Sequence, residues 1–189
     1  MRYKKFVGEN IYFSPIDSKD YEIFTKWVND ETVSRGIGSA GLSFSEVVEK
    51  NYLEKQENDI SKIQFSIIRK SDDKLLGTYG VVSIKPMHQI AEVGGFIGEQ
   101  TERGKGYGSE ALRMICDYCF NVLNLRNIYV NIYSFNIASQ KAAQKIGFAL
   151  VGRIKEAYYY NNAFHDQMIF QINKDGFNAK WQTFVQQIN

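Results

Sequence analysis

The stretch from residue 92 to residue 111, EVGGFIGEQTERGKGYGSEA, most constrains how this chain can fold. Its first part, Val93 to Ile97, is apolar and predicts a buried strand, while from Ser109 apolar side chains recur at three- and four-residue steps, which predicts a helix. Between them, three glycines alternate with Lys105 and Tyr107. Glycine allows positive φ and close backbone approach, and the first N–H groups of a helix lack intrahelical partners. This order therefore predicts an anion-binding loop for a pyrophosphate.

Two well-known phosphate loops are excluded by spacing. A P-loop requires a glycine separated by four residues from Gly-Lys-Ser/Thr, but Glu99 stands at that place and Gly106 follows Lys105. The dinucleotide fingerprint requires G-x-G-x-x-G, and Ser109 occupies its last position. A tight strand-to-helix turn without a ligand is the alternative interpretation of the glycines taken alone.

The pattern that fits is Arg-x-x-Gly-x-Gly, formed by Arg103, Gly106 and Gly108. It resembles the acetyl-CoA loop of the GNAT N-acetyltransferases. A second motif follows in the order that this family shows: an alternating strand over residues 126–134, then Asn136-x-x-Ser139, a helical run, and Gly147-Phe148. Two motifs at the family spacing are far more specific than either one alone.

The resemblance implies a fold and a domain organisation. We expect an α+β fold with a central, twisted, mixed but mostly antiparallel sheet of about seven strands flanked by helices. Residues 1–189 form a single N-acetyltransferase domain in this interpretation, with an added helix at the C-terminal end. Within the superfamily, the pattern is closest to the branch of ribosomal-protein N-terminal and spermidine acetyltransferases.

Side-chain patterns place the individual elements. Strands are expected at residues 10–13, 64–69, 75–84, 90–98, 127–134, 148–157 and 164–172, and helices after Asp17 or Ser18, after Ser43 or Ser45, and over residues 109–122, 139–146 and 175–188. Residues 33–42 are expected to form a flexible loop. Asn161-Asn162 predicts the turn between the last two strands.

Composition excludes several classes of protein. The 189-residue chain is 44% hydrophobic and 14% aromatic, which indicates a packed globule and not a disordered protein. A net charge of +2 without a Lys/Arg cluster argues against a nucleic-acid partner. No stretch resembles a membrane span or a signal peptide, so we expect no membrane partner and a cytoplasmic location. A homodimer is compatible with the sequence.

The two cysteines, Cys116 and Cys119, form a C-x-x-C pattern inside the predicted helix over residues 109–122. A redox or zinc site would need a helix N-terminus or further ligands at suitable spacing, and the sequence offers neither. We therefore expect both thiols in the core and no metal.

The resemblance also implies roles for particular residues. Glu92, at the start of the strand before the glycine loop, is the candidate general base. The backbone of Phe96 and Ile97 is expected to hold the pantetheine arm of acetyl-CoA and to polarise the thioester carbonyl, and Asn136 to bond the pantetheine amide. The pyrophosphate-binding residues are Arg103, Gly104, Lys105, Gly106, Tyr107 and Gly108.

The proton donor to the leaving thiolate departs from the family pattern. Many relatives carry tyrosine four residues before the Gly-Phe pair, where this chain has Ala143. Ser139 is therefore the candidate proton donor, and we expect it to contact the cofactor as well. An N-cap of the following helix is its alternative role.

The second predicted helix is acidic on its expected outer side, with Glu46, Glu49, Glu54, Glu57 and Asp59, while Val47, Val48, Tyr52 and Leu53 form its expected apolar face. One interpretation is an ordinary solvated face. The other is a collar that attracts a cationic acceptor.

Together these features predict an acetyl-CoA-dependent N-acetyltransferase that transfers acetyl directly to a primary amine in a ternary complex. The acceptor is either a protein N-terminus or a small amine, such as a polyamine or an amino sugar. The alternative is a non-catalytic acyl-CoA-binding domain, in which the loop persists without the chemistry.

Overall fold

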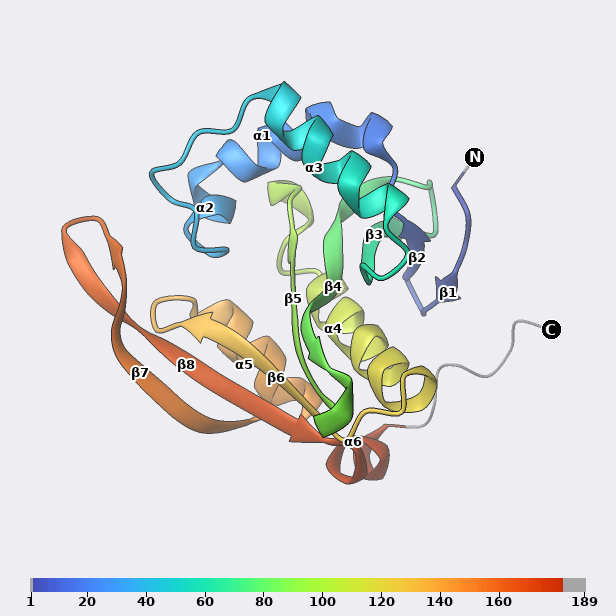
Figure 1. The fold of residues 1–189 in the computed structure, drawn as a ribbon, viewed down its shortest axis with the longest axis vertical. Helices are drawn as coiled ribbons and strands as arrows, with labels where there is room; N and C mark the ends of the chain where they lie inside the picture. Colours follow the sequence, from blue (N-terminus) through green and yellow to red (C-terminus); the bar gives the residue numbers. More distant parts are fainter. Residues whose placement is uncertain (1, 182–189) are drawn as a thin grey trace. The chain divides into compact units, whose positions relative to one another are not determined.

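The computed structural model describes residues 2–181. The chain forms two compact units, and each is built from two segments of the sequence (Figure 1). The first unit comprises Met1–Gly80 and Gly95–Tyr107, and the second comprises Val81–Gly94 and Gly108–Asn189. The assignment of residues 1–189 to a single domain stays a prediction.

The first unit contains most of the N-terminal elements. Its strands are β1 (Phe6–Val7), β2 (Ile11–Pro15), β3 (Gln64–Arg69), the first part of β4 (Leu75–Lys85) and the last part of β5 (Ile90–Ile97); its helices are α1 (Tyr21–Asn29), α2 (Glu31–Ser34) and α3 (Glu46–Asn58), with single 3-10 turns η1 (Ser18–Asp20) and η3 (Gln100–Glu102).

Local side chains explain where these helices begin. The Asp17 side chain accepts a hydrogen bond from Lys19 N, and Ser45 caps α3 by accepting from Val48 N. Asp30 accepts from the N–H groups of Thr32 and Val33 and starts α2, a helix that was not predicted and whose last two residues fall within the predicted loop over residues 33–42. Asp30, a residue type that favours helix N-caps, was the sequence signal for this helix.

Helices α1 and α3 pack together on one side of the strands of this unit (Figure 1). Their shared core holds Tyr12, Phe24, Trp27, Leu53, Ile68 and Leu75. The Tyr12 hydroxyl donates to Asp73 Oδ1 at 2.8 Å, and burial raises the pKa of this phenol to about 12. The helices therefore stand on β2, β3 and β4.

The second unit holds the rest of the chain. It contains η2 (Pro86–His88), α4 (Tyr107–Asp117) from Gly108 onward, a π-helical turn η4 (Tyr118–Val122), β6 (Asn127–Tyr133), α5 (Ile137–Ile146), β7 (Ala149–Tyr160), β8 (Ala163–Asn173) and α6 (Lys174–Lys180). Gly147 ends α5 with φ 118°, and Asn161 and Asn162 adopt φ 50° and 58° in the β7–β8 turn, as predicted.

Eight strands are hydrogen-bonded in the order β1-β2-β3-β4-β5-β6-β8-β7. The pairs β1/β2, β2/β3, β3/β4, β6/β8 and β7/β8 are antiparallel, and β5/β6 is parallel. The parallel pairing joins residues 90–92 to residues 127–129. The mixed, mostly antiparallel sheet is thereby confirmed, with the two-residue β1 as a strand that was not predicted.

The core of the second unit confirms the prediction for the cysteines. Cys116 and Cys119 are fully buried and free, and burial raises the pKa of both thiols, that of Cys119 to about 12. No helix in the described range has both the length and the hydropathy of a membrane span.

The C-terminal helix is shorter than predicted where it is described. Helix α6 ends at Lys180, and Trp181 Nε1 donates to the carbonyl oxygen of Ile146 at 2.8 Å. The rest of the predicted helix, including Phe184, Val185 and Ile188, lies outside the described residues.

Packing of α6 gives a first prediction. Phe177 is 1% exposed and its ring lies 5.3 Å from that of Phe120. Phe177→Ala should lower the free energy of unfolding by about 3–5 kcal/mol, because it leaves a cavity in the core. Phe164→Ala, at a 63% exposed aromatic of the same unit, is the control and should change it by no more than about 0.5 kcal/mol. Equal losses in urea titrations would contradict this description of α6.

Candidate functional site

The glycine loop has the geometry of an anion cradle. Gly104 and Gly106 adopt φ 77° and 93°, and helix α4 begins directly after them. A β-carbon built on either glycine meets no atom within 4 Å, so the space beside the loop is open. Among residues 2–181, the N–H groups of Gly104, Lys105 and Gly106 donate no backbone hydrogen bond. Open space beside unpaired N–H groups fits a phosphate.

Arg103 anchors this loop to the protein. Its guanidinium donates to the carbonyl oxygens of Ile97 and Gly98 at 2.9 and 3.0 Å, and to Thr32 Oγ1 at 2.5 Å. These bonds tie the loop to the end of β5 and to α2. A direct contact of Arg103 with a cofactor stays a prediction.

Glu102 organises the charges beneath the loop. Its carboxylate is 7% exposed and lies 2.9 Å from Lys105 Nζ, 2.9 Å from an Arg69 guanidinium nitrogen and 3.3 Å from Lys74 Nζ. The hydrogen bond from Lys105, followed by those from Arg69 and Lys74, lowers the pKa of Glu102 to about 2. Since Glu102 already pairs with the Lys105 ammonium, the backbone N–H of Lys105 is better placed than the ammonium to bind an anion.

Packing fixes the end of β5, where Phe96 and Ile97 lie. Gly98 N donates to the Leu76 carbonyl oxygen at 2.9 Å, and the Phe96 ring stands at 88° to the indole of Trp27. A β-carbon on Gly98 would lie 2.1 Å from that indole, so only glycine fits there. The backbone expected to hold pantetheine therefore rests on α1.

Glu92 lies in the second unit, where β5 pairs with β6. Its Oε1 accepts a hydrogen bond from Asn131 Nδ2 at 2.9 Å. Ala91 and Val93 on either side are buried, whereas Glu92 is half-buried, so the carboxylate emerges on the opposite face of the strand. Asn131 therefore orients the candidate base.

Asn136 and Ser139 meet at the start of α5. Asn136 Oδ1 accepts from Ser139 N at 3.2 Å, which makes Asn136 the N-cap. The alternative role of Ser139 as the N-cap is wrong, because it stands inside the first turn and donates its N–H to the cap. The expected contacts of Asn136 and Ser139 with the cofactor stay predictions.

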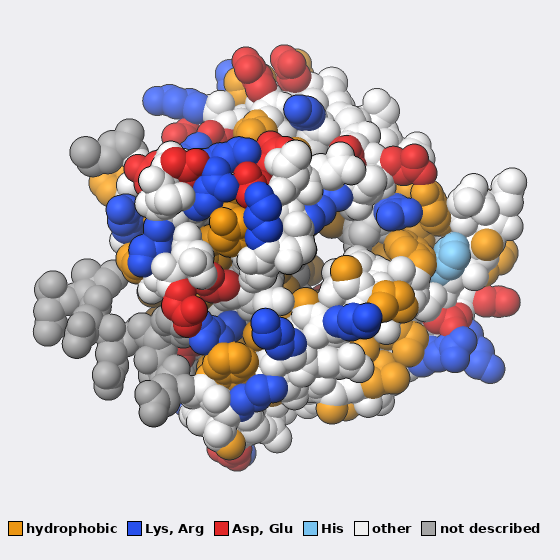
Figure 2. All heavy atoms as spheres, turned by 180° about the vertical axis from the view of Figure 1, so that it is seen from behind, with side chains coloured by type: hydrophobic (Ala, Val, Ile, Leu, Met, Phe, Trp, Pro, Cys, Tyr) orange, Lys and Arg blue, Asp and Glu red, His pale blue; other side chains and the backbone are white. Residues whose placement is uncertain are grey.

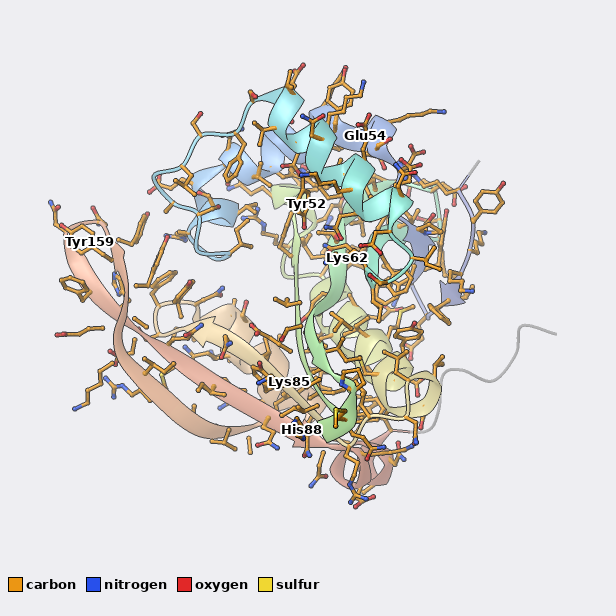
Figure 3. The ribbon with its side chains drawn as sticks, in the orientation of Figure 1. Tyr52, Glu54, Lys62, Lys85, His88 and Tyr159 are labelled. Carbon is orange, nitrogen blue, oxygen red and sulfur yellow. The ribbon has the colours of Figure 1, made fainter. Side chains whose placement is uncertain are left out.

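Tyr133 is a phenol that the sequence analysis did not single out. It follows Asn131 by two residues on β6, so both side chains project from the same face. Its ring stacks on Tyr158 at 4.3 Å, and burial raises its pKa. Tyr158 and Tyr160 belong to this aromatic cluster, while Tyr159 lies near the tip of the β7–β8 hairpin (Figure 3).

A cavity of about 240 Å³ lies within the first unit. Its lining includes eight apolar side chains from α1, α3, β5 and the segments that follow β2 and precede α3, and one charged residue, Glu49. Glu49 is 5% exposed, and burial raises the pKa of its carboxyl group. The sequence analysis assigned Glu49 to the exposed acidic side of α3, and this was wrong.

Charged side chains of both signs occur on the surface of the molecule. On the face shown in Figure 2, basic and acidic side chains are interspersed, as a net charge of +2 suggests. Within residues 2–181, no group of three or more His, Cys, Asp or Glu side chains is arranged to hold a metal ion.

Comparison with known proteins identifies the family. Residues 10–149 match the family model described as an acetyltransferase (GNAT) domain. The chain belongs to the GNAT acetyltransferases. The Probable N-acetyltransferase YjcK of Bacillus subtilis (strain 168) is 31% identical over 122 residues, which span 64% of this chain and 66% of that protein. The Uncharacterized N-acetyltransferase p20 of Bacillus licheniformis is 26% identical over 170 residues, 88% of this chain and 94% of that protein.

Solved structures confirm the fold of this GNAT acetyltransferase. A spermidine N-acetyltransferase from Vibrio cholerae, in complex with CoA and spermine, superposes with a TM-score of 0.82 at 19% identity, over 90% of this chain and 99% of that chain. An acetyltransferase (GNAT family) from Bacillus anthracis superposes with a TM-score of 0.78 at 22% identity, over 90% and 98%.

One position of this acetyltransferase departs from its family pattern. Ala143, where many relatives carry tyrosine, is fully buried in α5. A methyl group has no acidic proton, so Ala143 cannot protonate the leaving thiolate. Ser139 and Tyr133 are two residues of the second unit that carry a hydroxyl group, beside the tyrosines of β7.

The Glu102 cluster gives a prediction for stability against pH. A carboxyl group whose pKa is lower in the folded chain stabilises the fold above its unfolded pKa, and that contribution is lost as pH falls through the folded pKa. The advantage of the parent over Glu102→Gln in free energy of unfolding should therefore be full at pH 7 and shrink between about pH 4.5 and 2.

The control for this measurement is Glu99→Gln. Glu99 approaches Lys74 at 3.8 Å and is 27% exposed, so its removal should have a smaller effect. Denaturant titrations at pH 7, 4 and 2 measure the difference, and a Glu102→Gln deficit that does not change with pH would contradict the charge assignment.

Proposed function

We propose that this acetyltransferase transfers acetyl from acetyl-CoA directly to a primary amine in a ternary complex. The observation that carries the proposal is the glycine loop: left-handed Gly104 and Gly106, open space beside them and unpaired N–H groups that lead into α4. The loop suits the pyrophosphate of CoA, and the structure of the Vibrio cholerae relative is a complex with CoA. Acetyl-CoA supplies an activated thioester, so no acyl-enzyme is needed.

The backbone of Phe96 and Ile97 is assigned to the pantetheine arm. It lies at the end of β5, which Gly98 and Trp27 hold in place. An N–H in a rigid strand polarises a carbonyl without reorganisation, which favours negative charge on its oxygen. Asn136 keeps two amide hydrogens for the pantetheine amide while its oxygen caps α5.

Glu92 is assigned to the proton of the acceptor. An amine attacks only when neutral, so the ammonium form must lose a proton to a base, directly or through water. Asn131 orients the Glu92 carboxylate, and the half-buried position leaves it open to solvent. Ser139 is the assigned donor to the departing sulfur, with Tyr133 as the second hydroxyl to test.

The loop assignment predicts a specific loss of cofactor binding. Gly106→Ala should weaken acetyl-CoA binding at least about tenfold, because the methyl group enters the open space meant for the phosphate. It should also cost about 1–2 kcal/mol of folding free energy, since φ is 93°. Isothermal titration calorimetry measures the first effect and urea titration the second.

Gly41→Ala is the matched control for Gly106→Ala. Gly41 has φ 87° and also faces open space, so the substitution carries the same backbone penalty without touching the glycine loop. Unchanged acetyl-CoA binding by Gly106→Ala, or an equal loss in both variants, would contradict the pyrophosphate assignment.

The base assignment predicts a loss in rate. Glu92→Gln keeps the shape and the hydrogen bond from Asn131 but removes the proton acceptor, so kcat should fall by about 100-fold or more while acetyl-CoA affinity changes little. Asn131→Ala, which leaves the carboxylate without its orienting partner, should reduce kcat less. A Glu92→Gln enzyme as active as the parent would place the base elsewhere.

A further inference from the structure

The Glu49 side chain is largely buried and has no counter-ion among residues 2–181. It is 5% exposed, and within residues 2–181 it forms no ion pair and accepts no side-chain hydrogen bond. Among the described residues, Ser66 Oγ is the one fully buried side-chain oxygen or nitrogen without a partner, so the Glu49 oxygens remain accessible from the open cavity that this residue lines. A carboxylate in such mostly apolar surroundings favours a cation as its partner. Burial raises the pKa of this carboxyl group.

The carboxylate lines the cavity of about 240 Å³, and its surroundings there are mostly apolar. The uncharged polar groups of the lining are Ser39, Tyr52, Gln56, Gln64 and Thr78, and no basic residue is among them. Gln64 and Thr78 are bonded to each other at 2.7 Å. The cavity therefore offers one negative charge within an apolar wall.

The cavity opens to solvent along α3. Ile37, Val48 and Tyr52 line it and are 42%, 51% and 46% exposed. Tyr52 and Glu54 lie on different sides of α3 in Figure 3, so the helix presents apolar groups at the opening and acidic groups elsewhere. A helix that buries Glu49 and exposes Val47 and Val48 reverses the usual polarity, as expected where function overrides packing.

We propose that this cavity binds an alkylammonium group, with Glu49 as its counter-ion and the apolar wall around its carbon chain. The volume corresponds to about eight water molecules, which suits a chain of about five to seven heavy atoms. An ammonium donates up to three hydrogen bonds and supplies the charge that Glu49 lacks.

The inference rests on the proposed function, because it makes the cavity the acceptor subsite. Phe96 lines the cavity, and its backbone belongs to the segment assigned to the pantetheine arm. The nitrogen held at Glu49 is a cation, whereas the attacking nitrogen is neutral. The fitting acceptor therefore carries two amines on one aliphatic chain, of which Glu49 holds one and the other is acetylated.

Calorimetry of the full chain without acetyl-CoA tests the site directly. The probes are n-hexylamine and n-hexanol, which share the carbon chain and differ in charge. Hexylamine should bind the parent at pH 7, and Glu49→Gln should weaken it at least about tenfold while hexanol binding does not fall. Glu54→Gln, on the same helix but outside the cavity lining, should bind hexylamine like the parent.

The Glu49→Gln variant should fold. Because the pKa of Glu49 is raised in the folded chain, the free energy of unfolding falls as pH rises through that pKa and the carboxyl group ionises. The uncharged Gln side chain of the variant avoids this loss. Tyr52 is the other titratable group of the cavity lining, and its phenol is neutral at pH 7. Glu49→Gln should thus unfold no earlier than the parent in urea at pH 7.

Several results would overturn the site: no binding of hexylamine, equal effects of Glu49→Gln on both probes, or equal effects of Glu49→Gln and Glu54→Gln. If hexylamine fails to bind while another amine still yields free CoA, this inference is wrong and the proposed function stands. If hexylamine binds as expected and no amine yields free CoA, the site is supported and the proposed function is wrong.

Turnover gives the second measurement. With 1,6-diaminohexane as acceptor, Glu49→Gln should raise the KM for the diamine at least about tenfold, with kcat at saturation and the KM for acetyl-CoA little changed. A fall in kcat with an unchanged KM for the diamine would contradict a binding role for Glu49.

Discussion

The first unit depends on the close approach of two backbones, those of β4 and β5. A β-carbon on Gly77 would lie 2.0 Å from the Phe96 carbonyl oxygen, and one on Gly95 would lie 2.3 Å from that of Thr78. No other residue fits at such contacts, so the glycines set the course of β5 over residues 95–97. Gly98 against Trp27 and the Arg103 hydrogen bonds then carry that course into the glycine loop. Strand packing thus places the start of the loop, and Gly104 and Gly106 supply its left-handed backbone.

Glu102 and Glu49, the two buried glutamates of the first unit, differ in their cationic partners. Glu102 has three cationic partners, and their hydrogen bonds lower its pKa to about 2. Glu49 has none within residues 2–181, and burial raises its pKa. The first pattern is that of a structural ion cluster, which fixes a loop. The second is the pattern on which the proposed alkylammonium site rests.

Sequence patterns predicted every strand except β1, the glycine loop, the family and the buried cysteines, because each depends on local periodicity or on a motif with fixed spacing. The side of α3 that faces the core was predicted wrongly, since polarity alone places Glu49 outside and Val48 inside. Tertiary packing decides that orientation. Asn136, and not Ser139, caps α5, which depends on the exact start of that helix. The partners of Arg103 and Glu102 depend on contacts between residues far apart in the sequence.

Acetyl transfer from acetyl-CoA to a primary amine is tested most directly by the release of free CoA thiol. The full chain is assayed with aliphatic diamines, monoamines, amino sugars and peptides with free or blocked N-termini, and the products are identified by mass spectrometry. We predict thiol release that requires a primary amine and yields one acetylated nitrogen per thiol. Bound acetyl-CoA, seen as a raised melting temperature, without thiol release from any amine would contradict this function and indicate an acyl-CoA-binding domain without chemistry.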